Sequence, residues 1–111
     1  MAATEVKLQK VNLNKGLTLS AAAALDQTDG AYVDFTGQDT KTVIILSGSG
    51  EATIKAGTGI QGVSDMTVTA SANGTAVELD SGAFKITTGE HKGKVHITGA
   101  STIKVQAILL V

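Results

Sequence analysis

The sequence predicts a small all-β domain, an antiparallel β-sandwich or barrel with a jelly-roll or immunoglobulin-like topology. Apolar residues recur at every second position in many short segments, with Thr, Lys and Glu between them. Gly, Asn, Asp and Ser separate these segments at regular intervals, and no stretch keeps the period of a long helix. This spacing predicts about eight to ten short strands.

The segment 42–56 is the centre of the predicted domain. Its most apolar run, residues 43–46, ends at a Gly-Ser-Gly turn, after which Ala52 and Ile54 alternate with polar residues. This pattern predicts a β-hairpin whose first strand is buried on both faces and whose second strand is half-buried.

A similar pattern returns over residues 94–107, so we expect two related hairpin halves, residues 31–56 and 76–107. In this comparison residues 32–35 correspond to residues 76–79. An internal duplication would explain the similarity, and so would chance, because Gly and Thr are common throughout the chain.

The earlier part of the chain predicts shorter elements. Residues 5–13 alternate, but the phase slips, and a bulge near Gln9 and Lys10 would return the apolar residues to one side. Residues 21–25 could form a strand or one helical turn. Asp29-Gly30 predicts a turn, followed by a strand with Ala31, Val33 and Phe35 on one face.

The later part contains the strongest two-residue hairpin signal, Asn73-Gly74, between two alternating segments. Polar residues 88–93 predict a loop. The final residues, 107–111, are all apolar, and we expect them to pair in a sheet or against a partner, because natural proteins avoid exposed apolar edges.

Composition limits the class of protein. The 111 residues suffice for one domain, which we divide into an N-terminal strand or arm, residues 1–13, and a single β domain, residues 14–111. One Tyr, two Phe and no Trp leave aliphatic side chains to fill the core. We therefore expect modest stability, which burial of surface in an oligomer would increase.

Charge and targeting signals exclude other classes. A formal net charge of −1 with scattered Lys residues argues against nucleic-acid binding. No apolar run approaches the roughly 20 residues of a membrane span, and we see no signal peptide. The absence of Cys excludes a disulfide scaffold and a thiolate metal site.

No residue pattern predicts catalysis, a cofactor or a metal. Residues 57–62 match G-x-G-x-x-G, but a strand-like segment follows where the dinucleotide motif needs a helix, which favours a Gly-rich loop. His91 and His96 would lie on opposite faces of a continuous strand, and a zinc site needs three or four ligands. We interpret both as surface residues, and the chain as not an enzyme.

Acidic residues are assigned to turns and to solvent. Residues 26–30 lack the third-position acid and the closing Glu of a calcium loop, so we expect Asp26 to bond the local backbone. Glu78 and Asp80 would project from an exposed strand without nearby aromatic residues, and we interpret them as solvated. The sequon at Asn73 is interpreted as a turn.

Residues 39–110 resemble small structural proteins of tailed bacteriophages, which are Gly-, Thr- and Val-rich and lack Cys. The resemblance rests on GTGIQG at residues 57–62, VELDSGAFK at 77–85, and KGKVHITG at 92–99 followed by an IKV strand. It implies a head decoration (cement) protein. Such proteins sit outside the shell, often as trimers, and clamp neighbouring capsid subunits.

The resulting expectation is a non-enzymatic virion protein on the capsid surface, made in the host cytoplasm, which stabilises the capsid. Its partners would be the major capsid protein and itself, as a homo-oligomer with a trimer favoured. A tail, neck or fibre module and a carbohydrate-binding β-sandwich are the alternatives.

The N-terminal segment is the predicted contact, because a terminal strand can add to the sheet edge of another chain through main-chain hydrogen bonds. The alternative is an ordinary first strand of the sandwich. The residues predicted to contact the capsid or a neighbouring protomer are Glu5, Val6, Lys7, Leu8 and Lys10.

Overall fold

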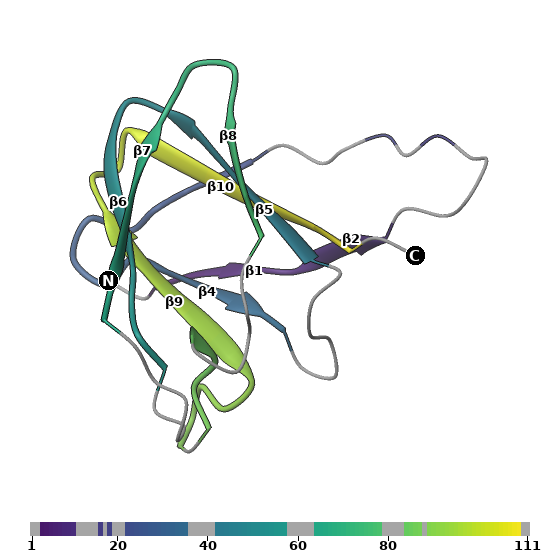
Figure 1. Cartoon of the computed structure of the whole chain (residues 1–111), viewed down its shortest axis with the longest axis vertical. Helices are drawn as coiled ribbons and strands as arrows, with labels where there is room; N and C mark the ends of the chain where they lie inside the picture. Colours follow the sequence, from purple (N-terminus) through teal and green to yellow (C-terminus); the bar gives the residue numbers. More distant parts are fainter. Residues whose placement is uncertain are drawn as a thin grey trace.

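The computed structural model has two β-sheets packed against each other, which confirms the predicted all-β sandwich (Figure 1). The structure describes residues 3–10, 16, 18, 22–35, 42–57, 64–78, 84–87 and 89–109. Within these ranges, no helix is long and apolar enough to cross a membrane.

Each sheet has five strands, and most neighbours are antiparallel. Sheet A has the order β1 (Thr4–Val6), β4 (Ala31–Asp34), β9 (Lys94–Gly99), β6 (Gly50–Ile54) and β7 (Met66–Ala70). Sheet B has the order β2 (Leu8–Lys10), β10 (Ile103–Leu109), β5 (Thr42–Gly48) and β8 (Thr75–Glu78), and β3 (Ala23–Ala24) also pairs with β10. The parallel pairs are β1–β4 and β2–β10.

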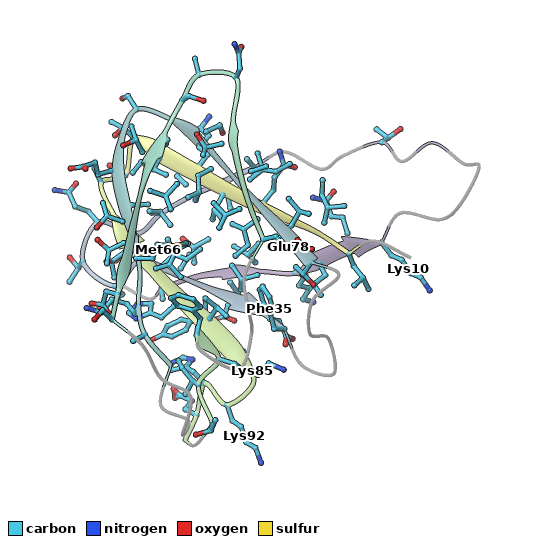
Figure 2. The ribbon with its side chains drawn as sticks, in the orientation of Figure 1. Lys10, Phe35, Met66, Glu78, Lys85 and Lys92 are labelled. Carbon is cyan, nitrogen blue, oxygen red and sulfur yellow. The ribbon has the colours of Figure 1, made fainter. Side chains whose placement is uncertain are left out.

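The core between the sheets is mainly aliphatic, as the composition predicts. Ala31, Val33 and Phe35 all lie on the inner face and are fully buried, which confirms the face predicted for this strand. Phe35 is labelled within the sandwich in Figure 2. Other fully buried side chains come from both sheets: Ile44, Leu46, Ile54, Val95, Ile97 and Ile103.

The predicted hairpins over residues 42–56 and 94–107 are both wrong, because β5 and β10 lie in sheet B whereas β6 and β9 lie in sheet A. Gly48 and Gly50 adopt φ values of 106° and 113°, and the chain crosses between the sheets at this point. Ile44 and Ile54 still point into the same core, since the two sheets face each other. Strands that pair side by side and strands that face each other across a core show the same alternation, so sequence could not separate them.

Burial of β5 also differs from the prediction. The inner residues Thr42, Ile44 and Leu46 are buried, whereas Val43 and Ile45 on the outer face are only half-buried. The strand therefore buries one face fully, not both.

The two segments 31–56 and 76–107 nevertheless have equivalent strand pairings. Strands β4, β5 and β6 lie in sheets A, B and A, and strands β8, β9 and β10 lie in sheets B, A and B. The pair Val33–Val95 between β4 and β9 corresponds to the pair Val77–Ile44 between β8 and β5. The pair Ala52–Gly99 between β6 and β9 corresponds to the pair Ile103–Gly48 between β10 and β5. Each segment thus supplies strands to both sheets, and the two interlock with two-fold related topology.

The N-terminal segment also passes from one sheet to the other. Strand β1 belongs to sheet A and β2 to sheet B, and Lys7 lies between them. Val6 is buried and Leu8 packs against the core. The predicted bulge near Gln9 and Lys10 is wrong, because both residues pair regularly with β10 and the irregularity falls at Lys7.

Of the other predicted elements, two are confirmed and one is confirmed as a turn but not as a hairpin. The strand alternative for residues 21–25 is confirmed by β3. Asn73-Gly74 does form a turn, in which the Gly74 N–H donates to the Ser71 carbonyl at 3.0 Å, but the strands on either side lie in different sheets and make no hairpin. The end of the chain pairs in sheet B through Leu109, as predicted, and residues 110–111 lie outside the described residues.

We expect Gly48→Ala to lower the free energy of unfolding more than Gly89→Ala. Both glycines have positive φ, 106° and 90°, so alanine costs about 1–2 kcal/mol at either position. At Gly48 the new Cβ would also clash with the Thr102 carbonyl oxygen, whereas no atom of the described residues lies within 4 Å of a Cβ at Gly89. Chemical denaturation should show an additional loss of about 2 kcal/mol for Gly48→Ala. Equal losses would contradict this crossing geometry.

Candidate functional site

An aromatic stack on the outer face of sheet A forms the candidate site. Tyr32 and His96 lie directly opposite each other on the neighbouring strands β4 and β9. Because Ala31 and Val33 point into the core, Tyr32 between them points outward. Its ring centroid lies 4.4 Å from that of His96, and the ring planes differ by 10°.

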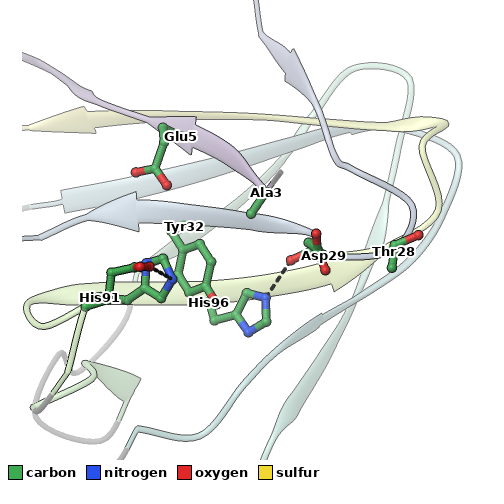
Figure 3. A pocket seen from close by; sticks show the side chains of 8 residues that line it. Ala3, Glu5, Thr28, Asp29, Tyr32, His91 and His96 are labelled. Atoms are coloured by element: carbon green, nitrogen blue, oxygen red, sulfur yellow. Dashed lines mark hydrogen bonds and ion pairs between the residues drawn. The ribbon is translucent and has the colours of Figure 1, made fainter. Parts of the chain in front are cut away.

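His91 covers the other face of the Tyr32 ring. The two centroids are 3.7 Å apart and the planes differ by 6°. His91 belongs to the turn just before β9, which folds back over sheet A. Figure 3 shows the three rings in a row with Tyr32 in the middle. Aromatic pairs in contact contribute about 0.5–1.5 kcal/mol each beyond the area they bury.

The sequence placed the two histidines on opposite faces only if one strand ran through both, and the structure does not meet this condition. β9 begins at Lys94, and His91 lies in the preceding turn, within the loop predicted for residues 88–93. Both imidazoles do lie at the surface, where each is half-buried against Tyr32. Sequence reasoning missed this stack because the pairing of β4 with β9 depends on strand order.

Hydrogen bonds determine the state of the imidazole nitrogens. His96 Nε2 donates to the Asp29 carbonyl oxygen at 2.8 Å, so Nδ1 carries the lone pair when the ring is neutral. His91 Nε2 lies 3.7 Å from Glu90 Oε1, and its buried Nδ1 has no hydrogen-bond partner among the described residues. The two histidines therefore differ in their polar surroundings although they share one aromatic neighbour.

An open hollow of about 530 Å³ lies beside the stack. Its acidic lining suits polar or cationic groups. Within the described part of the chain, no group of three or more His, Cys, Asp or Glu side chains is placed to hold a metal ion. The residues that line this hollow are Ala3, Glu5, Thr28, Asp29, Tyr32, Glu90, His91 and His96.

An ion pair ties the N-terminal strand to this site. Lys94 Nζ donates to Glu5 Oε1 at 2.8 Å, across the intervening strand β4. This hydrogen bond raises the pKa of Lys94 above its ordinary value of 10.5. The pair therefore fixes β1 against β9 and holds one carboxylate of the hollow in place.

A second hollow, of about 380 Å³, lies where the N-terminal segment passes from sheet A to sheet B. Four of the predicted contact residues, Glu5, Val6, Lys7 and Leu8, line it. The fifth, Lys10, is exposed and pairs with Leu109 at the edge of sheet B. The other lining residues are Gln9, Ala23, Val105 and Gln106.

The remaining predicted positions take local roles. Asp26 Oδ2 accepts hydrogen bonds from the N–H groups of Thr28 and Asp29 at 3.1 and 2.7 Å, which confirms that this carboxylate bonds its own turn. Glu78 is exposed on β8, as predicted, whereas Asp80 lies outside the described residues. Residues 58–62 of the Gly-rich match also lie outside them.

Comparison with protein-family models, curated proteins and solved structures found no match to this chain. The site is therefore interpreted from its own geometry and from the expectations of the sequence.

We expect Glu5→Gln to lower the pKa of Lys94, because the side chain that accepts the hydrogen bond from Lys94 Nζ loses its negative charge. A raised folded pKa means that this pair stabilises the fold below pH 10.5, and that the contribution disappears as the pH rises through the folded pKa. The loss of unfolding free energy at neutral pH should stay below about 1 kcal/mol, as for other partly exposed pairs. NMR titration of the Lys94 side chain measures the pKa. The control Glu90→Gln should change it less, and a larger change in the control would contradict the assignment.

Replacing Tyr32 by leucine should alter both imidazoles at once. Protons stacked on an aromatic face are shielded by its ring current, so Tyr32→Leu should shift the ring-proton resonances of His91 and His96 downfield. The free energy of unfolding should fall by about 1–3 kcal/mol, the sum of two aromatic pairs. If only one histidine responds in the NMR spectrum, the three-ring stack is incorrect.

Proposed function

We propose that this protein is a non-enzymatic structural component of a virion, which binds the outside of a phage capsid and bridges subunits of the major capsid protein. The resemblance of residues 39–110 to small structural proteins of tailed phages motivates the partner. The proposal includes self-association, for which that resemblance favours a trimer.

The observation that carries the proposal is the course of the N-terminal segment. Strand β1 is the last strand at one edge of sheet A, and β2 lies at an edge of sheet B. One short segment thus presents main-chain edges of both sheets. Edge strands can pair with a strand from another chain, where main-chain hydrogen bonds supply the affinity.

Side chains along the same segment add a contact surface. The hollow lined by residues 5–9 lies at the sheet crossing, and the Lys7 side chain is exposed beside it. A partner strand at this position could contact the aliphatic part of Leu8 and pair a carboxylate with Lys7. These features support binding to a protein surface and require no catalytic group.

The alternative of carbohydrate binding receives no support from the aromatic site. Sugar recognition usually uses an exposed aromatic face, and both faces of Tyr32 are covered by imidazole rings. A tail, neck or fibre location uses the same kind of surface, and the experiment below separates it from a head location.

We expect purified protein to cosediment with expanded phage heads that lack it, and Lys7→Glu to weaken this binding about tenfold, because charge reversal at a contact disturbs electrostatic complementarity. Lys7 lies between two strands, so the substitution leaves both ladders intact. The control is Lys92→Glu, the same change of charge at an exposed turn residue. Lys92 lies well away from the N-terminal Lys10 in Figure 2.

Two results would contradict the proposal. Absence of binding to such heads, with binding to tails instead, would assign the protein to another part of the virion. Equal binding by the Lys7 and Lys92 variants would show that the N-terminal segment is not part of the contact.

A further inference from the structure

The outer faces of the two sheets differ in chemical character. The outward residues of sheet A are polar or charged, as shown by Tyr32, His96, Thr53, Thr67 and Thr69. Sheet B instead turns branched aliphatic side chains outward: Val43 and Ile45 of β5 and Ile108 of β10, with Ala76 of β8 beside them.

These aliphatic residues form one continuous patch, which we call the sheet-B patch: Val43, Ile45, Ala76 and Ile108. The strand register shows that they are neighbours. Ile45 lies opposite Ala76 on one side, and Val43 lies opposite Ile108 on the other. Each of the three larger side chains is only half-buried, and Ala76 is exposed. None of the four belongs to the core cluster or packs against it.

We propose that the sheet-B patch is an interface with a second copy of this chain, packed face to face about a two-fold axis. The first support is β5 itself, which carries apolar residues toward both faces. Such runs are typical of strands buried on both sides. A single copy buries only the inner face of β5, and a second copy on the patch would bury the outer face.

Charge placement supports a copy of the same chain as the occupant. Lys104 lies at one corner of the outer face, opposite Ser47 on β5, and Glu78 lies at the diagonal corner, opposite Val43. Ile45 lies between these two corners. Both charged side chains are exposed, and neither has an ion-pair partner among the described residues.

A two-fold axis in the plane of the patch, passing through Ile45, brings complementary charges together. It places Lys104 of one copy over Glu78 of the other, and the same pair forms a second time by symmetry. Ile45 then meets its own counterpart at the centre. Lys104 and Glu78 lie on the rim, which they share with Gln106 opposite Ile45 and Ser47 opposite Lys104, and a polar rim is usual for a protein interface.

This inference rests on the proposed function only in that self-association belongs to it. The contact is pairwise and differs from the trimer that the resemblance favours, so the two expectations predict different assembly sizes in solution. It uses the face of sheet B and leaves the Lys7 region outside the patch, so a failure of capsid binding and a failure of dimerisation are separate results.

Sedimentation of the full chain alone, from micromolar to millimolar concentration, tests the proposal. We expect a reversible monomer–dimer equilibrium, and Ile45→Lys should weaken dimerisation about a hundredfold, because it places a charge at the centre of the interface. The matched control is Thr67→Lys, which adds the same charge to the outer face of sheet A. Far-UV circular dichroism and thermal unfolding show whether both variants remain folded.

Charge reversal gives a second test that does not depend on the apolar centre. Glu78→Lys and Lys104→Glu each place like charges together twice in a dimer, so each variant alone should dimerise about tenfold more weakly. An equimolar mixture of the two variants restores both pairs in a mixed dimer. Association should therefore return in the mixture and in the double variant.

The following results would overturn the proposed two-fold interface. A chain that stays monomeric at all concentrations, or forms only trimers, excludes the two-fold contact. If Ile45→Lys and Thr67→Lys change dimerisation equally, the sheet-B patch is not part of the interface. Failure of the mixed charge-reversed variants to associate better than either alone would show that Lys104 does not face Glu78.

Discussion

The close approach of the two inter-sheet connections is the constraint on which the rest of this fold depends. Gly48 lies against the Thr102 carbonyl, and in the equivalent position a Cβ on Gly99 would lie 3.2 Å from the Glu51 carbonyl oxygen. The Thr102 hydroxyl also donates to the Ser49 carbonyl at 2.9 Å. The connections β5–β6 and β9–β10 therefore cross in contact, and side chains at these two glycines would hold them apart.

This crossing explains why neither half of the chain forms a sheet by itself. Strand β5 finds its neighbours, β8 and β10, in the second segment, and β9 finds β4 and β6 in the first. Within both sheets, strands of residues 31–56 pair with strands of the second segment. The aliphatic core between the sheets is therefore shared, and its stability depends on both segments being in place. An aromatic-poor sequence can fill such a core because interlocked sheets bring many small side chains together.

The same arrangement sets the character of the two outer surfaces. Pairing of β4 with β9 brings Tyr32 beside His96, and the turn before β9 adds His91. Pairing of β5 with β8 and β10 gathers aliphatic residues on the opposite surface. The N-terminal segment joins the two sheets at their edges. The protein thus has a polar surface with an aromatic stack on sheet A, a patch of aliphatic residues on sheet B, and an edge segment between them.

The sequence by itself determined the all-β class, most of the strands, their inward-facing residues and the turns at Asp29-Gly30 and Asn73-Gly74. These features are local, because alternation and turn chemistry depend only on near neighbours in the chain. The similarity between residues 31–56 and residues 76–107 coincides with equivalent strand pairings of the two segments, although chance would also explain it at the level of sequence. Which strands pair, and in which sheet, was decided only by the tertiary structure. A strand that faces another across a core has the same pattern as one that pairs beside it, so the crossings at Gly48 and Gly99 and the stack on Tyr32 could not be predicted from spacing.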